Sequence, residues 1–197
     1  MKRVVMVIAT VCIATSAFAG NNKVHFGFKD IAFGQTKEQT EKSLRKHYPA
    51  KNGADPMKTS NHAAWLRNVE VDGVTCDLDF YFDNNGKLYK YEISSAGYDA
   101  RQIGDALPHS TAKINDLFAK KFNPPHTCNK PSVKEIAGVQ EGRELYNCMW
   151  EFPGHNVFTA YRTHEGKFFA FGSVSDKKIE HDFLEHLLDQ GNAKTAK

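Results

Sequence analysis

The sequence predicts an α+β protein made of two similar units in tandem, each a helix followed by three antiparallel strands, with a further helix at the C-terminus. Two observations lead to this class. A capped helix and then three strand-like segments occur twice in the same order. A Gly-Lys turn followed by an aromatic strand also occurs twice, at Gly86-Lys87 and at Gly166-Lys167. Because each unit is too small to bury its apolar face well alone, we expect both to share one sheet, with the helices on one face.

The first unit covers residues 20–99. Its helix begins after Thr36, where Thr36-Lys-Glu-Gln39 forms a capping box, and Pro49 stops it. The three predicted strands cover residues 63–71, 74–82 and 88–93. The middle strand has apolar side chains on its even positions, and the Asn85-Gly86 pair after it is typical of a two-residue hairpin turn. The alternation places the odd residues of this strand on the other side of the sheet: Thr75, Asp77, Asp79 and Tyr81.

The second unit covers residues 100–175. We expect Ser110 or Thr111 to cap its helix, and Pro108 to end a short preceding helix over residues 98–107. Its predicted strands cover residues 145–152, 156–163 and 168–174.

The C-terminal helix is predicted over residues 176–190 and ends at Gly191, so that a disordered tail covers residues 191–197. Two explanations of the repeated order stay open at this point. The units arose by duplication, or two α+β segments resemble each other by chance.

Residues 1–19 have the pattern of a secretory signal peptide. Lys2 and Arg3 precede an apolar run, and Ala17-Phe18-Ala19 is a cleavage box, so we expect cleavage after Ala19 and a periplasmic or secreted protein. The run is too short for a bilayer, which needs about 20 residues, and no transmembrane segment is predicted elsewhere. Without Lys2 and Arg3, 24 basic residues remain against 23 acidic ones, a net charge of about +1 that argues against a nucleic-acid partner.

Export to an oxidising compartment favours a disulfide among the cysteines that remain after cleavage. We pair Cys128 with Cys148, because closing such a loop stabilises the chain by about 3 kcal/mol in the chain-entropy model. Cys76 lies on the apolar side of the strand over 74–82. It is either a small buried hydrophobe or a reactive or intermolecular thiol.

Aromatic residues at equivalent places in the two units form the predicted binding surface. They are Tyr81, Tyr89, Tyr91, Tyr161, Phe169 and Phe171, with Asp77 and Asp79 as the polar component. An exposed aromatic sheet face with charged neighbours is typical of a surface that binds another exported or envelope protein. In the alternative interpretation, both faces are covered and these rings only stabilise cross-strand pairs.

Catalytic and metal-binding motifs are absent from the sequence. It has no Gly-x-Ser-x-Gly and no Cys-x-x-Cys, and His181 and His186 are five residues apart, which turns them onto different faces of a helix. We therefore expect no catalytic residue, no cofactor and no metal site, and a protein that acts by binding. The alternatives are a cell-envelope hydrolase with a carboxylate or histidine site that cannot be placed, and a carrier of a small ligand or metal.

The segment FGQTKEQTEKSL, residues 33–44, and the repeated helix-then-hairpin order resemble the β-lactamase-inhibitor-protein fold. The resemblance covers residues 29–175 and implies tandem α+β units that form a curved sheet, whose concave aromatic face holds a partner protein. A disulfide from Cys128 to Cys148 fits this family. The first unit departs from the pattern, because Cys76 has no partner there.

Overall fold

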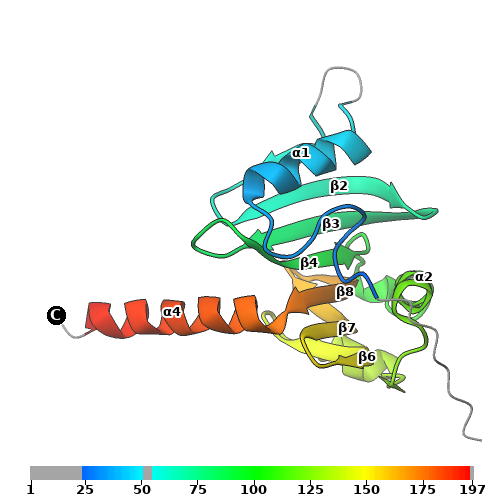
Figure 1. The fold of residues 1–197 in the computed structure, drawn as a ribbon. Coiled ribbons are helices and arrows are strands. Elements are labelled where there is room, and N and C mark those ends of the chain that lie inside the picture. The colour runs from blue at the N-terminus through cyan, green and yellow to red at the C-terminus, as the bar shows by residue number, and fades with distance from the viewer. Residues whose placement is uncertain (1–23, 51–54, 196–197) are drawn as a thin grey trace, which may run out of the picture.

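The computed structural model describes residues 24–50 and 55–195; the predicted signal peptide lies outside these ranges. In this part of the chain, eight strands form one antiparallel sheet in the order β1-β2-β3-β4-β8-β7-β6-β5 (Figure 1). The α+β class is confirmed. The two central strands, β4 and β8, belong to opposite halves of the chain, so one sheet joins both halves.

The first half follows the predicted order closely. Its elements are α1 (Lys37–His47), β1 (Met57–Thr59), β2 (Ala63–Val71), β3 (Val74–Phe82) and β4 (Leu88–Ser94). The capping box at Thr36 is present, since its side chain accepts a hydrogen bond from the Gln39 backbone and the Gln39 side chain accepts one from the Thr36 backbone. Strand β1 was not predicted, because three residues are too few to show an alternation.

The second half contains the remaining elements: a 3-10 turn (Ala100–Gln102), α2 (Ala106–Phe122), β5 (Thr127–Cys128), α3 (Val133–Ala137), β6 (Glu144–Phe152), β7 (His155–His164), β8 (Lys167–Asp176) and α4 (Lys177–Thr195). Helix α3 was not predicted, although Ser132 and Glu135 form a capping box that marks its start.

The start of α2 corrects a prediction. The helix begins at Ala106, so neither Ser110 nor Thr111 caps it, and Pro108 lies in its first turn. Proline is tolerated there because the first backbone N–H groups of a helix have no acceptor within the helix. Thr111 is buried inside the helix, and its hydroxyl donates a hydrogen bond to the Leu107 carbonyl at 2.8 Å.

The sheet has two sides, which we name by neighbouring residues of β4. Tyr91 is paired with Val174 and Glu92 with Ser173, so these pairs point to opposite sides. On the Tyr91 face, helix α2 comes so close to β8 that a Cβ atom on Gly172 would lie 2.3 Å from the Phe118 ring. The N-terminal segment also packs on this face, where the Phe28 ring contacts Phe80 and Tyr91. The Glu92 face carries the polar side chains described below.

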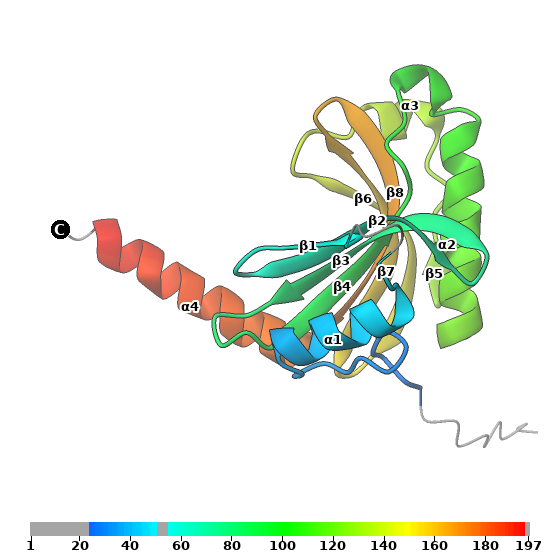
Figure 2. The same ribbon diagram turned by 90° about the horizontal axis from the view of Figure 1, so that it is seen from above.

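Helix α4 projects from the body of the molecule in both views (Figures 1 and 2). It continues past Gly191 to Thr195, beyond its predicted end and into the segment predicted as a disordered tail. Near its beginning it packs on the sheet, where Phe183 contacts the Tyr89 ring at 5.2 Å. Farther along, Leu184, Leu187 and Leu188 are exposed. Among the described residues, no helix is both long enough and apolar enough to cross a membrane.

The predicted pairing of cysteines is confirmed. Cys128 and Cys148 form a disulfide between the short strand β5 and its neighbour β6, where they also stand directly opposite each other. Cys76 is a free thiol, buried on the Tyr91 face. Burial raises the pKa of this thiol to about 12, so the thiolate needed for reactivity is not formed near neutral pH.

Candidate functional site

Glu92 is the centre of a polar network on the sheet. It is 1% exposed, yet three side chains bind its carboxylate. Arg162 of β7 donates to Oε2 at 2.6 Å, the Tyr81 hydroxyl of β3 donates to the same oxygen at 3.1 Å, and Lys90 Nζ lies 3.0 Å from Oε1. Arg162 is also 4.5 Å above the Phe171 ring. The network therefore ties three strands together and fixes the side chains around it.

The charged side chains around Glu92 determine whether its carboxyl group is protonated. Burial by itself raises the pKa of Glu92, but Lys90 and Arg162 outweigh it and leave the pKa below its ordinary value. The carboxylate is therefore ionised near neutral pH, as its partners require. Burial also raises the pKa of Asp79, and Arg67 opposes this only in part.

A second ion cluster lies beside Glu92 on the first half of the sheet. Arg67 donates to Asp79 at 2.8 Å, and its Nε lies 3.5 Å from Asp77. Asp77 also accepts a hydrogen bond from the Asn68 backbone at 2.8 Å, where the ladder between β2 and β3 shifts register. Asn68 has a positive φ of 53°, so this bulge turns the backbone N–H toward the carboxylate.

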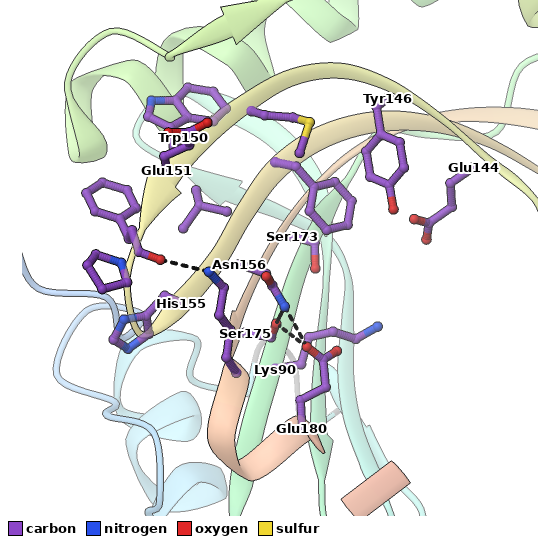
Figure 3. A pocket seen from close by; sticks show the side chains of 16 residues that line it. Lys90, Glu144, Tyr146, Trp150, Glu151, His155, Asn156, Ser173, Ser175 and Glu180 are labelled. Atoms are coloured by element: carbon purple, nitrogen blue, oxygen red, sulfur yellow. Dashed lines mark hydrogen bonds between the residues drawn. The ribbon is translucent and has the colours of Figure 1, made fainter. Parts of the chain in front are cut away.

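Two open grooves lie on the Glu92 face. The first, of about 780 Å³, runs along β6 and β7 and is lined by Tyr146, Met149, Phe158 and the beginning of α4. Figure 3 shows Glu180 of α4 reaching Asn156 and Ser175, at 2.9 Å and 2.7 Å, while Tyr146 and Glu144 lie farther along the groove. Tyr146 and Met149 are 42% and 44% exposed, so the groove presents apolar side chains to solvent.

The second groove, of about 610 Å³, lies over the ion cluster. Its lining includes Arg67, Asp77, Asp79, Tyr81, Arg162 and Phe169. Glu144 borders both grooves. Burial raises the pKa of Glu144, and the negative charge of Glu92 adds to this effect.

The structure separates the predicted binding residues into four groups. Asp77, Asp79, Tyr81 and Phe169 lie together on the Glu92 face, and all four line the second groove. Phe171 points to the same side, but the prediction that it is exposed is wrong, because it is fully buried beneath Phe158 and Arg162. Tyr89, near the start of the central strand β4, contacts Phe183 of α4.

The prediction that Tyr91 and Tyr161 belong to an exposed sheet face is wrong. Both point to the Tyr91 face and are buried, at 1% and 5% exposure. The prediction grouped residues by their place in the repeat, whereas the side of each ring depends on the register of its own strand. Tyr91 follows an irregularity between β3 and β4 that changes which residues share a side.

Sequence reasoning missed Lys90, Glu92, Arg162, Tyr146 and Met149. Lys90 and Glu92 alternate with Tyr91 and Ile93 along the strand. This alternation could have predicted that Lys90 and Glu92 share one side of the sheet. No sequence signal connects them with Arg162, which lies 70 residues away and arrives through the pairing of β4 with β8.

Within the described ranges, no group of three or more His, Cys, Asp or Glu side chains is arranged to hold a metal ion. Comparisons with protein-family models, curated proteins and solved structures found no match to this chain.

Proposed function

We propose that this chain is an exported, non-enzymatic protein-binding module that holds another exported or envelope protein against the Glu92 face. It would act by occlusion, as an inhibitor, an immunity-type protein or an assembly factor. Stable interfaces bury about 800 Å² on each partner, an area that a contact spanning both grooves could supply. The signal peptide predicted in residues 1–19 supports the periplasm or the cell exterior as the place of action.

The proposal rests on one observation. On the Glu92 face, the charged side chains form ion pairs with one another, while apolar side chains remain partly exposed. Tyr146 packs edge-on against Phe158 at 5.0 Å, and Met149 stands opposite Phe158 in the ladder. Rigid aromatic and methionine side chains beside paired charges are typical of the anchors in protein interfaces. Because the ion pairs are already formed, a partner would meet a surface that needs little ordering.

A hydrolase or a carrier of small ligands has weaker support. Three carboxylates in or beside the second groove are engaged, since Arg67 binds both Asp77 and Asp79, and Glu92 has two cationic partners. A general acid or base needs a proton that it can exchange with a substrate, and these pairs oppose that exchange. Both grooves are also open to solvent, whereas small-ligand sites usually enclose most of the ligand.

We also propose that the two halves are copies of one unit with the helices on a common side, as the resemblance to the β-lactamase-inhibitor-protein fold implies. The strand order supports this, because four strands of one half meet four strands of the other along β4 and β8. A helix precedes the strands in each half, α1 before β1 and α2 before β5. In such an arrangement the face opposite the helices remains for a partner.

The Glu92 face is tested by removing its exposed apolar side chains. Tyr146→Ser and Met149→Ser should each weaken partner binding by roughly 5- to 30-fold, because interface anchors contribute about 1–2 kcal/mol or more. Neither change should unfold the chain, since both side chains are more than 40% exposed. The mature chain serves as bait in an envelope extract, and the captured protein is then purified for affinity measurements with each variant.

Val133→Ser is the matched control. Val133 is 52% exposed but lies on α3, outside both grooves, so its loss should leave the affinity unchanged. Equal affinities for the control and for the Tyr146→Ser, Met149→Ser double variant would contradict the proposal.

A further inference from the structure

Lys121 of α2 occupies an unusual place on the Tyr91 face. Its Nζ donates a hydrogen bond to the Tyr91 hydroxyl at 3.0 Å and another to the Gly27 carbonyl of the N-terminal segment. It also lies 5.3 Å from the centre of the Tyr91 ring and 5.4 Å from that of Phe122. Within residues 24–50 and 55–195 it forms no ion pair with a carboxylate.

A small cavity of about 200 Å³ adjoins this amine. Its walls are mostly apolar and include Phe28, Val71, Ile93, Leu117 and Phe118, and Lys121 itself is part of the lining. Since a water molecule takes up about 30 Å³ in the liquid, the space corresponds to roughly six or seven heavy atoms. The cavity is therefore suited to a short apolar molecule.

The surroundings of Lys121 favour its neutral form. Burial lowers its pKa to about 8, against the ordinary 10.5, and the charge of Asp72 in the β2–β3 turn opposes this shift only weakly. The other charged or titratable groups around the cavity are Lys29 of the N-terminal segment and Tyr91 of β4. At pH 7 roughly 10% of such an amine is neutral, compared with roughly 0.03% of an ordinary lysine.

The hydrogen bonds fit a neutral amine as well. A neutral amine has two N–H groups, and Tyr91 and Gly27 provide two acceptors, which leaves the nitrogen lone pair available. The Tyr91 hydroxyl accepts from Lys121 and so keeps its own proton for donation. An amine beside a hydroxyl, in an apolar space, is the arrangement used for attack on carbonyl compounds.

We propose that Lys121 is a site for covalent capture of short-chain apolar aldehydes, which enter the cavity and form an imine. The nitrogen lone pair attacks the carbonyl carbon and a C–N bond forms as the C=O π bond breaks. The oxygen takes up a proton and the nitrogen releases one, which gives a neutral carbinolamine. Loss of the second nitrogen-bound proton and of the hydroxyl group as water then leaves the C=N bond. Tyr91 is placed to donate a proton to the oxygen. No oxidant or reductant is needed.

The test uses pentanal with the folded mature chain at pH 7, and cyanoborohydride, whose hydride reduces the imine to a stable secondary amine. Peptide mapping by mass spectrometry then measures the modified fraction of each lysine. Lys120 is the matched internal control, because it is the neighbouring residue on the same helix but is exposed. We expect Lys121 to react at least tenfold faster than Lys120, and the preference to vanish in urea, where both lysines are solvated.

Two further measurements define the site. Tyr91→Phe keeps the ring and removes the hydroxyl, and it should slow the reaction of Lys121 without changing that of Lys120. Glyoxylate, a small charged aldehyde, should show no preference for Lys121, because its carboxylate is not accommodated by the apolar walls. Reaction of Lys121 no faster than Lys120, or equal preference for pentanal and glyoxylate, would overturn the proposal.

Discussion

Glu92 shows how a single residue organises this protein. Its side chain is 2% exposed, whereas its partners Lys90 and Arg162 keep 24% and 28% of their surface exposed. The carboxylate therefore depends on its partners for the polar contacts that water would otherwise supply. The cations retain some access to water, which places them between the buried centre of the sheet and its surface.

Glu92→Gln should lower the free energy of unfolding by about 2–3 kcal/mol. Removing one member of a buried ion pair costs about 3–5 kcal/mol, and the partial exposure of Lys90 and Arg162 reduces that cost because water can solvate them. Urea denaturation at pH 7 measures the difference. Glu70→Gln, an exposed change on β2, is the control and should cost less than about 0.5 kcal/mol.

The pH dependence of this difference has a definite sign. The pKa of Glu92 is lower in the folded chain than its ordinary value of 4.5, so its stabilisation is complete above pH 4.5 and is lost as the pH falls through the folded pKa. The gap between the wild type and Glu92→Gln should therefore narrow below pH 4.5. A gap that stays constant down to pH 3 would contradict the assigned ion pairs.

At the scale of elements, helix α2 and strand β8 depend on a glycine at their contact. The Phe118 ring is 2% exposed and lies against Gly172, where any Cβ would come within 2.3 Å of it. The ring cannot move aside freely, because it also packs against Phe122 and Trp150. The distance between this helix and the sheet is thus set by the absence of a side chain at residue 172.

Gly172→Ala should destabilise the chain by about 2 kcal/mol, since overpacking of a filled core typically costs about 1–3 kcal/mol. The matched control is Gly154→Ala in the β6–β7 turn, where a Cβ has no atom within 4 Å, and it should change stability by less than about 0.5 kcal/mol. Urea denaturation of both variants gives the comparison. Equal stabilities would mean that α2 and β8 do not approach as closely as described.

At the scale of the whole molecule, a continuous sheet unites the two halves and α4 extends beyond it (Figure 2). The first turns of α4 contact the sheet through Glu180 and Phe183. The exposed leucines beyond that point add apolar surface without supporting the fold.

A chain that ends at His186 should retain its stability within about 0.5 kcal/mol, because Leu187 and Leu188 are exposed. A chain that ends at Asp176 also loses Glu180 and Phe183 and should be less stable by about 1–2 kcal/mol. Thermal or urea unfolding distinguishes the two. Similar stabilities for both truncations would show that the start of α4 does not brace the sheet.

Much of the local structure could be predicted because it depends on short-range signals. The strands over 63–71 and 74–82 have their predicted bounds, since Asp72-Gly73 turns and period-2 alternation act within a few residues. The disulfide could also be predicted, because only three cysteines lie outside the predicted signal peptide. The start of α2 could not be predicted from the sequence. Proline breaks a helix in its interior but is tolerated in the first turn, where Pro108 lies.

The sequence by itself determined the class, the strand turns, the cap at Thr36 and the side on which Asp77, Asp79 and Tyr81 lie. These features follow from the chemistry of adjacent residues. Only the tertiary structure decided that Glu92 meets Arg162, and that Tyr91 turns inward to Lys121. Both contacts depend on strand register and on the pairing of β4 with β8. This pairing brings together residues that are far apart in the chain.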